Sequence, residues 1–307
     1  MEATRAFSHP AFFYRDEAEY LDCTLAFILD GLAAGEPVAV AVPGPRLELI
    51  HNALGPVADG VHFTDMATAG RNPGRIIPGV LAAFADAQPD GPVRIVGEPV
   101  WPGRTSLEYP ACVQHEARIN AAFHGRTLTI LCPYDAIRLG PQVLGDAYAT
   151  HPVVIEGGRG RPSVHYAPEL AAASYNRPLA EPRYAAAFAF DEERLRDARR
   201  FAIRAAGGLG LTGSRLDDLA LAVAELTTNS VLHGGGSGVI RVWAEGGQVA
   251  CEVRDGGRLA DPLAGSRMPA AERSGGRGLL MVHQLSDLVR THTAANGTAI
   301  RCYLAPA

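Results

Sequence analysis

The sequence predicts two domains of different fold class, a mostly parallel α/β sheet in the first half and an α+β sandwich in the second. In the first half, short continuous apolar runs alternate with helix-like segments, a pattern typical of strands covered on both faces. In the second half, two pairs of strands are each joined by a short turn containing Gly, and helices lie between them in the chain. The 307 residues are also long enough for about two domains.

The first half reads as helices and strands in alternation. Helical spacing of apolar residues predicts helices at 17–34, 46–54, 74–87 and 109–123. The apolar runs between them predict strands at 37–42, 61–64, 93–97 and 128–132. This alternation is the basis for the parallel sheet, which we assign to a domain at residues 1–155.

Residues 156–183 are rich in Gly, Pro and Arg and show no sustained periodicity. We therefore expect a linker here, with one helical turn near 169–174. The second domain would span 184–307.

The second domain has a different order of elements. Helices are predicted at 191–206, 215–232 and from residue 278, with Asp191 as the cap of the first. Strands are predicted at 184–190, 238–244, 248–254, 288–293 and 298–304. Turns at Glu245-Gly246-Gly247 and Asn296-Gly297 would join the last four strands in pairs, and we expect a mixed sheet.

The composition excludes several chemistries. All 28 residues counted as Lys or Arg are arginine, so a Walker phosphate loop, a Schiff-base lysine and the protein-kinase fold cannot be built in their usual form. The net charge of −5 predicts neither direct nucleic-acid binding nor attachment to a membrane surface. With no signal-peptide pattern and five scattered cysteines, we expect a cytoplasmic protein.

The long helix at 215–232 carries a polar row. Glu225, Asn229 and His233 are four residues apart and therefore share one face. A polar row on an otherwise core-forming helix is costly unless it meets water, an ion or a ligand. On its own, such a row is most often a solvated surface.

Two segments containing Gly follow this helix. Asp255-Gly256-Gly257 comes directly after a strand, and Gly275-Gly276-Arg277-Gly278 opens a helix, where backbone amides attract phosphate. Each segment alone is most often just a turn. In this order, and together with the polar row, they resemble the N, G1 and G2 boxes of the GHKL (Bergerat) ATP-binding fold, which gyrase B, histidine kinases and anti-sigma factor kinases share.

This resemblance implies that ATP and Mg²⁺ are the bound groups. Asn229 would bind Mg²⁺, and Asp255 would accept a hydrogen bond from the adenine amino group, with Gly257 letting the base sit close. His233, on the same helix face, joins them as a nucleotide-binding candidate. Glu225 would act as the general base that polarises the attacking hydroxyl or water.

The resemblance also implies how the phosphates are held. Gly275, Gly276 and Gly278 would present backbone N–H groups, and Arg277 would add a positive charge nearby. Residues 258–274 would form a lid over the nucleotide.

A compact ATP domain that begins with a strand, without a preceding helical pair carrying a phospho-acceptor His, resembles the RsbW/SpoIIAB-like anti-sigma factor serine kinases. This implies a sigma factor as partner, or a STAS-type anti-anti-sigma protein phosphorylated on Ser or Thr, and it allows a homodimer. Leu259 stands where many members have a further Gly, so the resemblance implies nucleotide binding more firmly than efficient catalysis.

Segments of the first half resemble the MEDS sensory domain, which has a RecA-like core. The matching segments are His9 with the following FFYRDEAEYL, GLAAGEPVAVAVP, Gly97-Glu98-Pro99, Arg118-Ile119-Asn120, Cys132-Pro133-Tyr134-Asp135 and His151-Pro152. No G-x-x-x-x-G-K segment is present, so we expect this half to sense a small molecule or partner rather than hydrolyse ATP. The fusion of the two halves resembles the RsbA-family anti-sigma regulators.

Polar and aromatic residues near the predicted strand ends are candidates for a sensor pocket, since α/β sheets bind ligands there. They are His9, Glu98, Trp101, Tyr134, Asp135 and His151. The alternative for each is a structural role in capping or bonding a loop.

His9, Cys132 and His151 have side chains that suit zinc or a haem iron, but they form no compact ligand motif. The sequence therefore favours Cys132 as a small buried apolar residue over a metal ligand.

Three functions remain open from sequence. The first is a switch protein that sequesters a sigma factor or phosphorylates its antagonist. The second is a catalytically inactive module that binds ATP and controls transcription through partner binding only. The third is a DNA-binding regulator, which the charge of −5 and the lack of a helix-turn-helix pattern disfavour.

Overall fold

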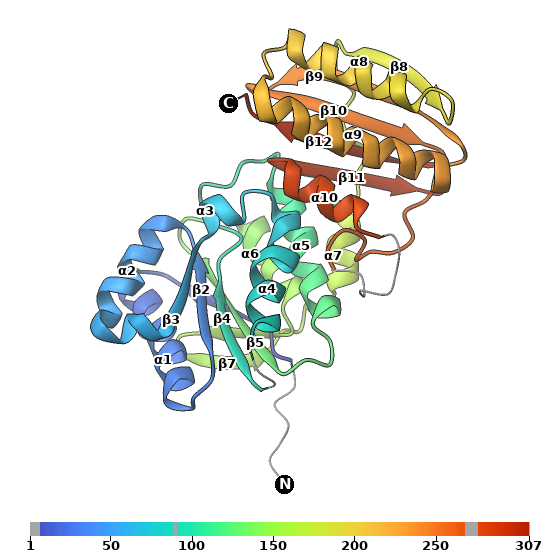
Figure 1. Cartoon of the computed structure of the whole chain (residues 1–307). Helices are drawn as coiled ribbons and strands as arrows, with labels where there is room; N and C mark the ends of the chain where they lie inside the picture. The colour runs from blue at the N-terminus through green and yellow to red at the C-terminus, as the bar shows by residue number, and fades with distance from the viewer. Residues whose placement is uncertain (1–6, 89–90, 268–275, 307) are drawn as a thin grey trace. The chain divides into compact units, whose positions relative to one another are not determined.

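The computed structural model describes residues 7–88, 91–267 and 276–306 (Figure 1). The chain divides into two compact units, Met1–Tyr175 and Asn176–Ala307. Within the described ranges, none of the helices has the length and hydropathy needed to cross a membrane.

The first unit is built on a seven-stranded sheet with the strand order β3-β2-β4-β5-β1-β6-β7. Its strands are β1 (Pro10–Tyr14), β2 (Val38–Val42), β3 (Val61–Asp65), β4 (Val93–Gly97), β5 (Leu128–Asp135), β6 (Val153–Glu156) and β7 (Arg159–Pro162). Every neighbouring pair from β3 to β6 is parallel, and β7 pairs antiparallel with β6. The expected mostly parallel α/β sheet is confirmed.

Helices cover both faces of this sheet. They are α1 (Glu17–Ala33), α2 (Gly44–Leu54), α3 (Met66–Ala69), α4 (Ala83–Asp86), α5 (Tyr109–Ala122), α6 (Pro141–Thr150) and α7 (Pro168–Ser174), with short helices η1 (Gly55–Gly60), η2 (Pro73–Arg75) and η3 (Ile77–Ala82). In β1, Phe12 packs in one buried cluster with Tyr20 of α1, whereas Ala11 and Phe13 pack in a second cluster with Ile119 of α5. Strands buried on both faces explain why the apolar runs are continuous.

The helix predicted at 74–87 is instead a succession of three short segments, η2, η3 and α4. Pro78, near the start of the π-helical segment η3, has no N–H to donate, so a regular α-helix cannot run through it. Strands β1, β6 and β7 and helix α6 were not predicted.

The predicted linker at 156–183 contains β7 and α7, and the first unit continues to Tyr175. Gly157 and Gly158, both with positive φ, form the turn that brings β7 back along β6. All four residues of β7 are exposed, so the strand has no apolar alternation by which sequence could reveal it.

The rest of the predicted linker lies against the second unit's sheet. Asn176 donates from Nδ2 to the carbonyl of Thr293 at 2.8 Å. Arg301 donates to the carbonyl of Ala180 at 2.7 Å, and Glu181 forms ion pairs with two strand arginines. These bonds hold the segment along the strands.

The second unit has a five-stranded sheet with the order β11-β12-β10-β9-β8. Its elements are β8 (Ala186–Asp191), α8 (Leu195–Gly208), α9 (Gly213–His233), β9 (Ser237–Glu245), β10 (Gln248–Asp255), α10 (Gly278–Leu285), β11 (Leu288–Ala294) and β12 (Gly297–Leu304). All four strand pairings are antiparallel, so the expectation of a mixed sheet was wrong. Helix α9 packs against both α8 and α10 on one face of the sheet, which confirms the α+β sandwich (Figure 1).

Helix α8 begins later than predicted. Its first residue is Leu195, and the carboxylate of Asp191 accepts a hydrogen bond from the backbone N–H of Arg194 at 3.2 Å. Asp191 therefore satisfies a backbone donor ahead of the helix, but it is not the residue at the cap position.

Candidate nucleotide-binding site

Helix α9 presents the predicted polar row along one side. Glu225 and Asn229 are half-buried and His233 is exposed, while Leu219 and Val223 are fully buried in the core. The helix is thus held by its apolar side, which fixes the direction in which the polar side chains project.

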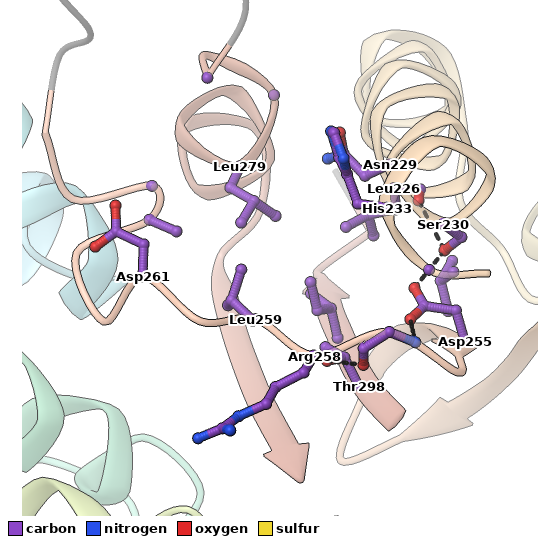
Figure 2. Close-up of a pocket in the computed structure, with 18 of the residues that line it drawn as sticks. Leu226, Asn229, Ser230, His233, Asp255, Arg258, Leu259, Asp261, Leu279 and Thr298 are labelled. Carbon is purple, nitrogen blue, oxygen red and sulfur yellow. Dashed lines mark hydrogen bonds between the residues drawn. The ribbon is translucent and has the colours of Figure 1, made fainter. Parts of the chain in front are cut away.

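Asp255 is the last residue of β10, and both oxygens of its carboxylate accept hydrogen bonds. Oδ1 accepts from the backbone N–H of Gly257 at 2.9 Å, and Oδ2 accepts from the hydroxyl of Ser230 at 2.7 Å (Figure 2). A Cβ atom at Gly234 would lie 2.4 Å from Cγ of Asp255, so only glycine allows this approach. Each carboxylate oxygen has two lone pairs, so Asp255 can still accept a hydrogen bond from a ligand.

The backbone at Gly257 passes close to the end of α9. A Cβ atom there would lie 2.4 Å from the carbonyl oxygen of His233. The hydroxyl of Thr298 donates to the carbonyl of Gly257 at 2.8 Å, and Thr293 is in turn within 2.9 Å of that hydroxyl. The backbone of the loop after β10 therefore contacts the end of α9 on one side and is hydrogen-bonded to β12 on the other.

The start of α10 meets the polar row of α9. A Cβ atom at Gly278, the first residue of α10, would lie 2.5 Å from Oε2 of Glu225 and 3.2 Å from Nδ2 of Asn229. Gly276 has a positive φ of 83°, and Arg277 is the exposed N-cap residue. Gly275 lies outside the described residues.

These elements surround a cavity of about 840 Å³, within the range of small-molecule sites (Figure 2). Six predicted nucleotide-binding residues line it: Asn229, His233, Asp255, Gly257, Gly276 and Gly278. Glu225 and Arg277 are not among its lining residues. Residues 258–267 of the expected lid contribute Arg258, Leu259, Asp261, Leu263, Ala264, Gly265 and Arg267 to the wall, whereas 268–274 lie outside the described residues.

Sequence reasoning missed several lining residues. They are Leu226, Ser230, Gly234, Val253, Leu279, Thr298 and Ile300. Ser230 lies three residues before His233 and could have been proposed from helix geometry. Thr298 lies opposite Asp255 in the β10–β12 pairing, which only the strand register reveals.

The cavity combines an apolar wall with groups suited to a nucleotide. Leu226, Leu279 and Ile300 can contact a flat aromatic ring, and Asp255 can accept from an amino group on its edge. The amide oxygen of Asn229 is the kind of ligand that Mg²⁺ takes alongside phosphate oxygens and water. Backbone N–H groups at the start of α10 can bind phosphate oxygens. The residues present therefore fit ATP with Mg²⁺.

In the first unit, the six sensor candidates do not come together in a single group. His9, Tyr134 and His151 lie together with Glu116 and Cys132, and the rings of His9 and His151 are 4.1 Å apart. Burial, together with the neighbouring His151, lowers the pKa of His9 to about 4. Burial raises the pKa of the Cys132 thiol well above its usual range.

Glu98 belongs to a second group with Tyr14, Tyr20 and Arg46. The guanidinium of Arg46 lies over the ring of Tyr20 at 4.4 Å and donates to the hydroxyl of Tyr14 at 3.4 Å. Burial raises the pKa of Glu98 to about 8, while Arg46 acts in the opposite direction and Asp135 adds to the rise.

Trp101 and Asp135 have structural partners. The guanidinium of Arg104 stacks on Trp101 at 3.8 Å and donates to three backbone carbonyls, which fixes this loop. Asp135 accepts from the backbone N–H groups of Ile137 and Arg138 at the end of β5.

Each half of the chain matches the model of a known protein family. Residues 8–152 match the family model described as MEDS, the MEthanogen/methylotroph, DcmR Sensory domain. Residues 188–304 match the histidine kinase-like ATPase domain. No curated protein matched the chain.

Among solved structures, similarity was found to the crystal structure of the RsbU and RsbW domains of Rv1364c from Mycobacterium tuberculosis. The match covers 40% of this chain and 33% of that one, at 21% identity and a TM-score of 0.31. The similarity thus spans about a third of the matched protein. From the two family matches, the chain joins an N-terminal MEDS domain to a C-terminal histidine kinase-like ATPase domain.

Proposed function

We propose that this protein is an ATP-binding anti-sigma regulatory factor whose MEDS domain controls its ATPase-like domain. The ATPase-like domain would sequester a sigma factor, phosphorylate a Ser or Thr of a STAS-type anti-anti-sigma protein, or do both. The observation that carries the proposal is the cavity in which the α9 polar row, Asp255 and the start of α10 meet, inside the region that matches the histidine kinase-like ATPase domain.

Three groups would hold the nucleotide. Asp255, oriented by Ser230 and Gly257, would accept from the adenine amino group. Asn229 would bind Mg²⁺, which when present neutralises phosphate charge. The amides around Gly276 and Gly278 would donate to phosphate oxygens, so the site needs no lysine.

The segment between the two matched regions supports an anti-sigma regulator over a sensor histidine kinase. Between residues 152 and 188, the chain forms the β6–β7 hairpin and one seven-residue helix, α7. A sensor histidine kinase carries its phospho-acceptor His on a helical pair ahead of the ATPase domain, and this segment contains no such pair.

Glu225 would act as the general base in phosphotransfer to a partner's hydroxyl. Phosphoryl transfer depends mainly on positioning and charge neutralisation, so a carboxylate one helical turn from Asn229 is suitably placed to orient the acceptor. A second candidate function is nucleotide-dependent partner binding without turnover. Glu225 lies against Gly278 and is not itself among the cavity-lining residues, which favours this alternative.

Transfer of label from [γ-³²P]ATP to candidate STAS proteins tests the enzymatic part. Wild-type protein should label one STAS protein, and Asn229→Ala should weaken ATP–Mg²⁺ binding by at least about tenfold. Glu225→Ala should retain nucleotide binding and lose transfer. Thr228→Ala, an exposed change on the same helix, serves as the control.

The outcomes separate the two candidates. Equal transfer by wild type and Glu225→Ala would exclude Glu225 as the base. Nucleotide binding that depends on Asn229, without transfer to any STAS protein, would favour the binding module. Affinity capture from native cytoplasm with ATP–Mg²⁺ or ADP should retain a sigma factor in one state and a STAS protein in the other.

A further inference from the structure

Four buried side chains with metal-binding atoms converge inside the MEDS domain. His9 precedes β1, Glu116 lies on α5, Cys132 on β5 and His151 just after α6. None is more than 1% exposed, and one ligand atom from each lies within 4.8 Å of those of the other three. Four elements far apart in sequence thus bring two imidazoles, a carboxylate and a thiol to one point.

The spacing of these atoms is close to that of the ligand atoms around a tetrahedral ion. Bonds of roughly 2.0–2.3 Å place tetrahedral ligand atoms about 3.3–3.8 Å apart. Here Oε2 of Glu116 is 3.2 Å from Nε2 of His9 and 3.3 Å from Nε2 of His151. The sulfur of Cys132 is 3.4 Å from Nε2 of His9 and 4.0 Å from Oε2 of Glu116.

Nδ1 of His9, the ring nitrogen that faces Asn120 rather than Glu116, donates a hydrogen bond. Asn120 donates through Nδ2 to the carbonyl of Thr150 at 2.8 Å, so its Oδ1 is the acceptor that faces Nδ1 of His9 at 3.2 Å. Nδ1 of His9 therefore carries the proton, and Nε2 of the neutral ring points a lone pair at Glu116.

His151 has the same arrangement. Its Nδ1 lies 2.9 Å from the carbonyl oxygen of Ala147, which can only accept, so Nδ1 carries the proton here too. Nε2 of His151 then faces the same carboxylate oxygen, and neither this nitrogen nor Oε1 of Glu116 has a hydrogen-bond partner in the described chain. Two imidazole nitrogens and a carboxylate that converge in a buried site are a donor set that a bound cation would stabilise.

We propose that His9, Glu116, Cys132 and His151 bind one Zn²⁺ ion. Two nitrogens, one sulfur and one oxygen are all zinc ligands, and a bound ion would hold the Cys132 sulfur as thiolate. Asn120 and the carbonyl of Ala147 orient the two imidazoles from outside, as is usual for metal-bound histidine.

The surroundings make this a closed site. The adjoining cavity, between Glu116, Tyr134 and Thr150, has a volume of about 10 Å³, enough for about one water molecule. A haem or an organic ligand has no room there. With four protein ligands, the ion would tie together β1, α5, β5 and the α6–β6 connection, so its presence would control the stability of the MEDS domain.

Metal content of the full-length protein tests the site. Protein purified without a histidine tag should contain about one zinc ion per chain. Cys132→Ser and His151→Gln should lose it, whereas Cys112→Ser, which alters a buried thiol outside the four ligands, should keep it. Asn120→Ala leaves all four ligands in place and should weaken zinc binding about 10- to 100-fold.

Cobalt substitution keeps the test independent of variant folding. After zinc is exchanged for Co²⁺ in the wild-type protein, the intense visible bands of a tetrahedral site and a thiolate-to-cobalt band should appear. Iron at the site in place of zinc, metal content unaffected by the Cys132 and His151 changes, or an octahedral cobalt spectrum without the thiolate band would each overturn the proposal.

Discussion

The hydroxyl of Ser230 donates to Oδ2 of Asp255 at 2.7 Å, which joins the last turn of the sandwich's long helix α9 to the end of strand β10. Ser230 is buried and lies one residue after Asn229. The same helix turn therefore carries the proposed Mg²⁺ ligand and orients the proposed adenine acceptor, so the two ends of the proposed nucleotide site are set by one rigid element.

We predict that Ser230→Ala weakens nucleotide binding about tenfold, because it removes a hydrogen bond to a charged acceptor. Isothermal titration calorimetry with ATP–Mg²⁺ measures the change. Ser214→Ala makes the same substitution at an exposed position in the first turn of α9 and should leave binding unaltered. An affinity equal to wild type in Ser230→Ala would show that Asp255 needs no such orientation.

Gly257→Ala should abolish nucleotide binding and destabilise the second unit by roughly 1–3 kcal/mol. The new methyl group would lie 2.4 Å from the backbone carbonyl of His233, which cannot rotate away. Gly256→Ala is the matched control, since its nearest contact would be an ordinary 3.5 Å. Thermal unfolding and ATP titration of both variants check the prediction, and it fails where the two behave alike.

The candidate nucleotide site could largely be located from sequence because its parts are local. Glu225, Asn229 and His233 share a face through helix periodicity alone, and Asp255-Gly256-Gly257 is a continuous segment. The parts that were missed depend on tertiary structure. Thr298 reaches the site through the β10–β12 register, and Leu279 through the packing of α10 on α9.

The cluster of four metal-binding side chains in the MEDS domain could not be predicted from sequence. His9, Cys132 and His151 have no compact spacing, and Glu116 gives no signal in a helix whose apolar pattern is weak. They meet because the strand order places β1 between β5 and β6, and parallel neighbours bring residues more than a hundred positions apart to the same level. The exposed strand β7 was missed for the opposite reason, since no buried face patterns its sequence.

Breaking the ion pair between Glu252 and Arg301 should destabilise the second unit strongly. Arg301 donates to Oε2 of Glu252 from Nε at 3.0 Å and from Nη2 at 2.8 Å, and both residues are buried. Glu252→Ala would leave the buried guanidinium with the more distant carboxylate of Glu245, at 3.8 Å, and breaking a buried ion pair costs about 3–5 kcal/mol.

Urea unfolding followed by the fluorescence of Trp243 reports on this unit, with Trp101→Phe as the common background. Glu193→Ala, an exposed change ahead of α8, is the control. A loss below about 1 kcal/mol, the usual worth of an exposed pair, would contradict the prediction.

Glu98→Gln should stabilise the first unit increasingly as the pH rises from 5 to 8. Burial raises the pKa of Glu98 to about 8, against an ordinary value near 4.5. Between these values, the unfolded chain releases the proton and the folded chain retains it, so the wild-type carboxyl costs progressively more stability as pH increases. The difference between variant and wild type should be small at pH 5 and reach at most about 5 kcal/mol at pH 8.

Urea unfolding monitored by Trp101 in a Trp243→Phe background measures this difference in stability, with the exposed Glu48→Gln as control. A difference that does not vary with pH would mean that Glu98 ionises normally in the folded protein, in which case Arg46 would have offset its burial.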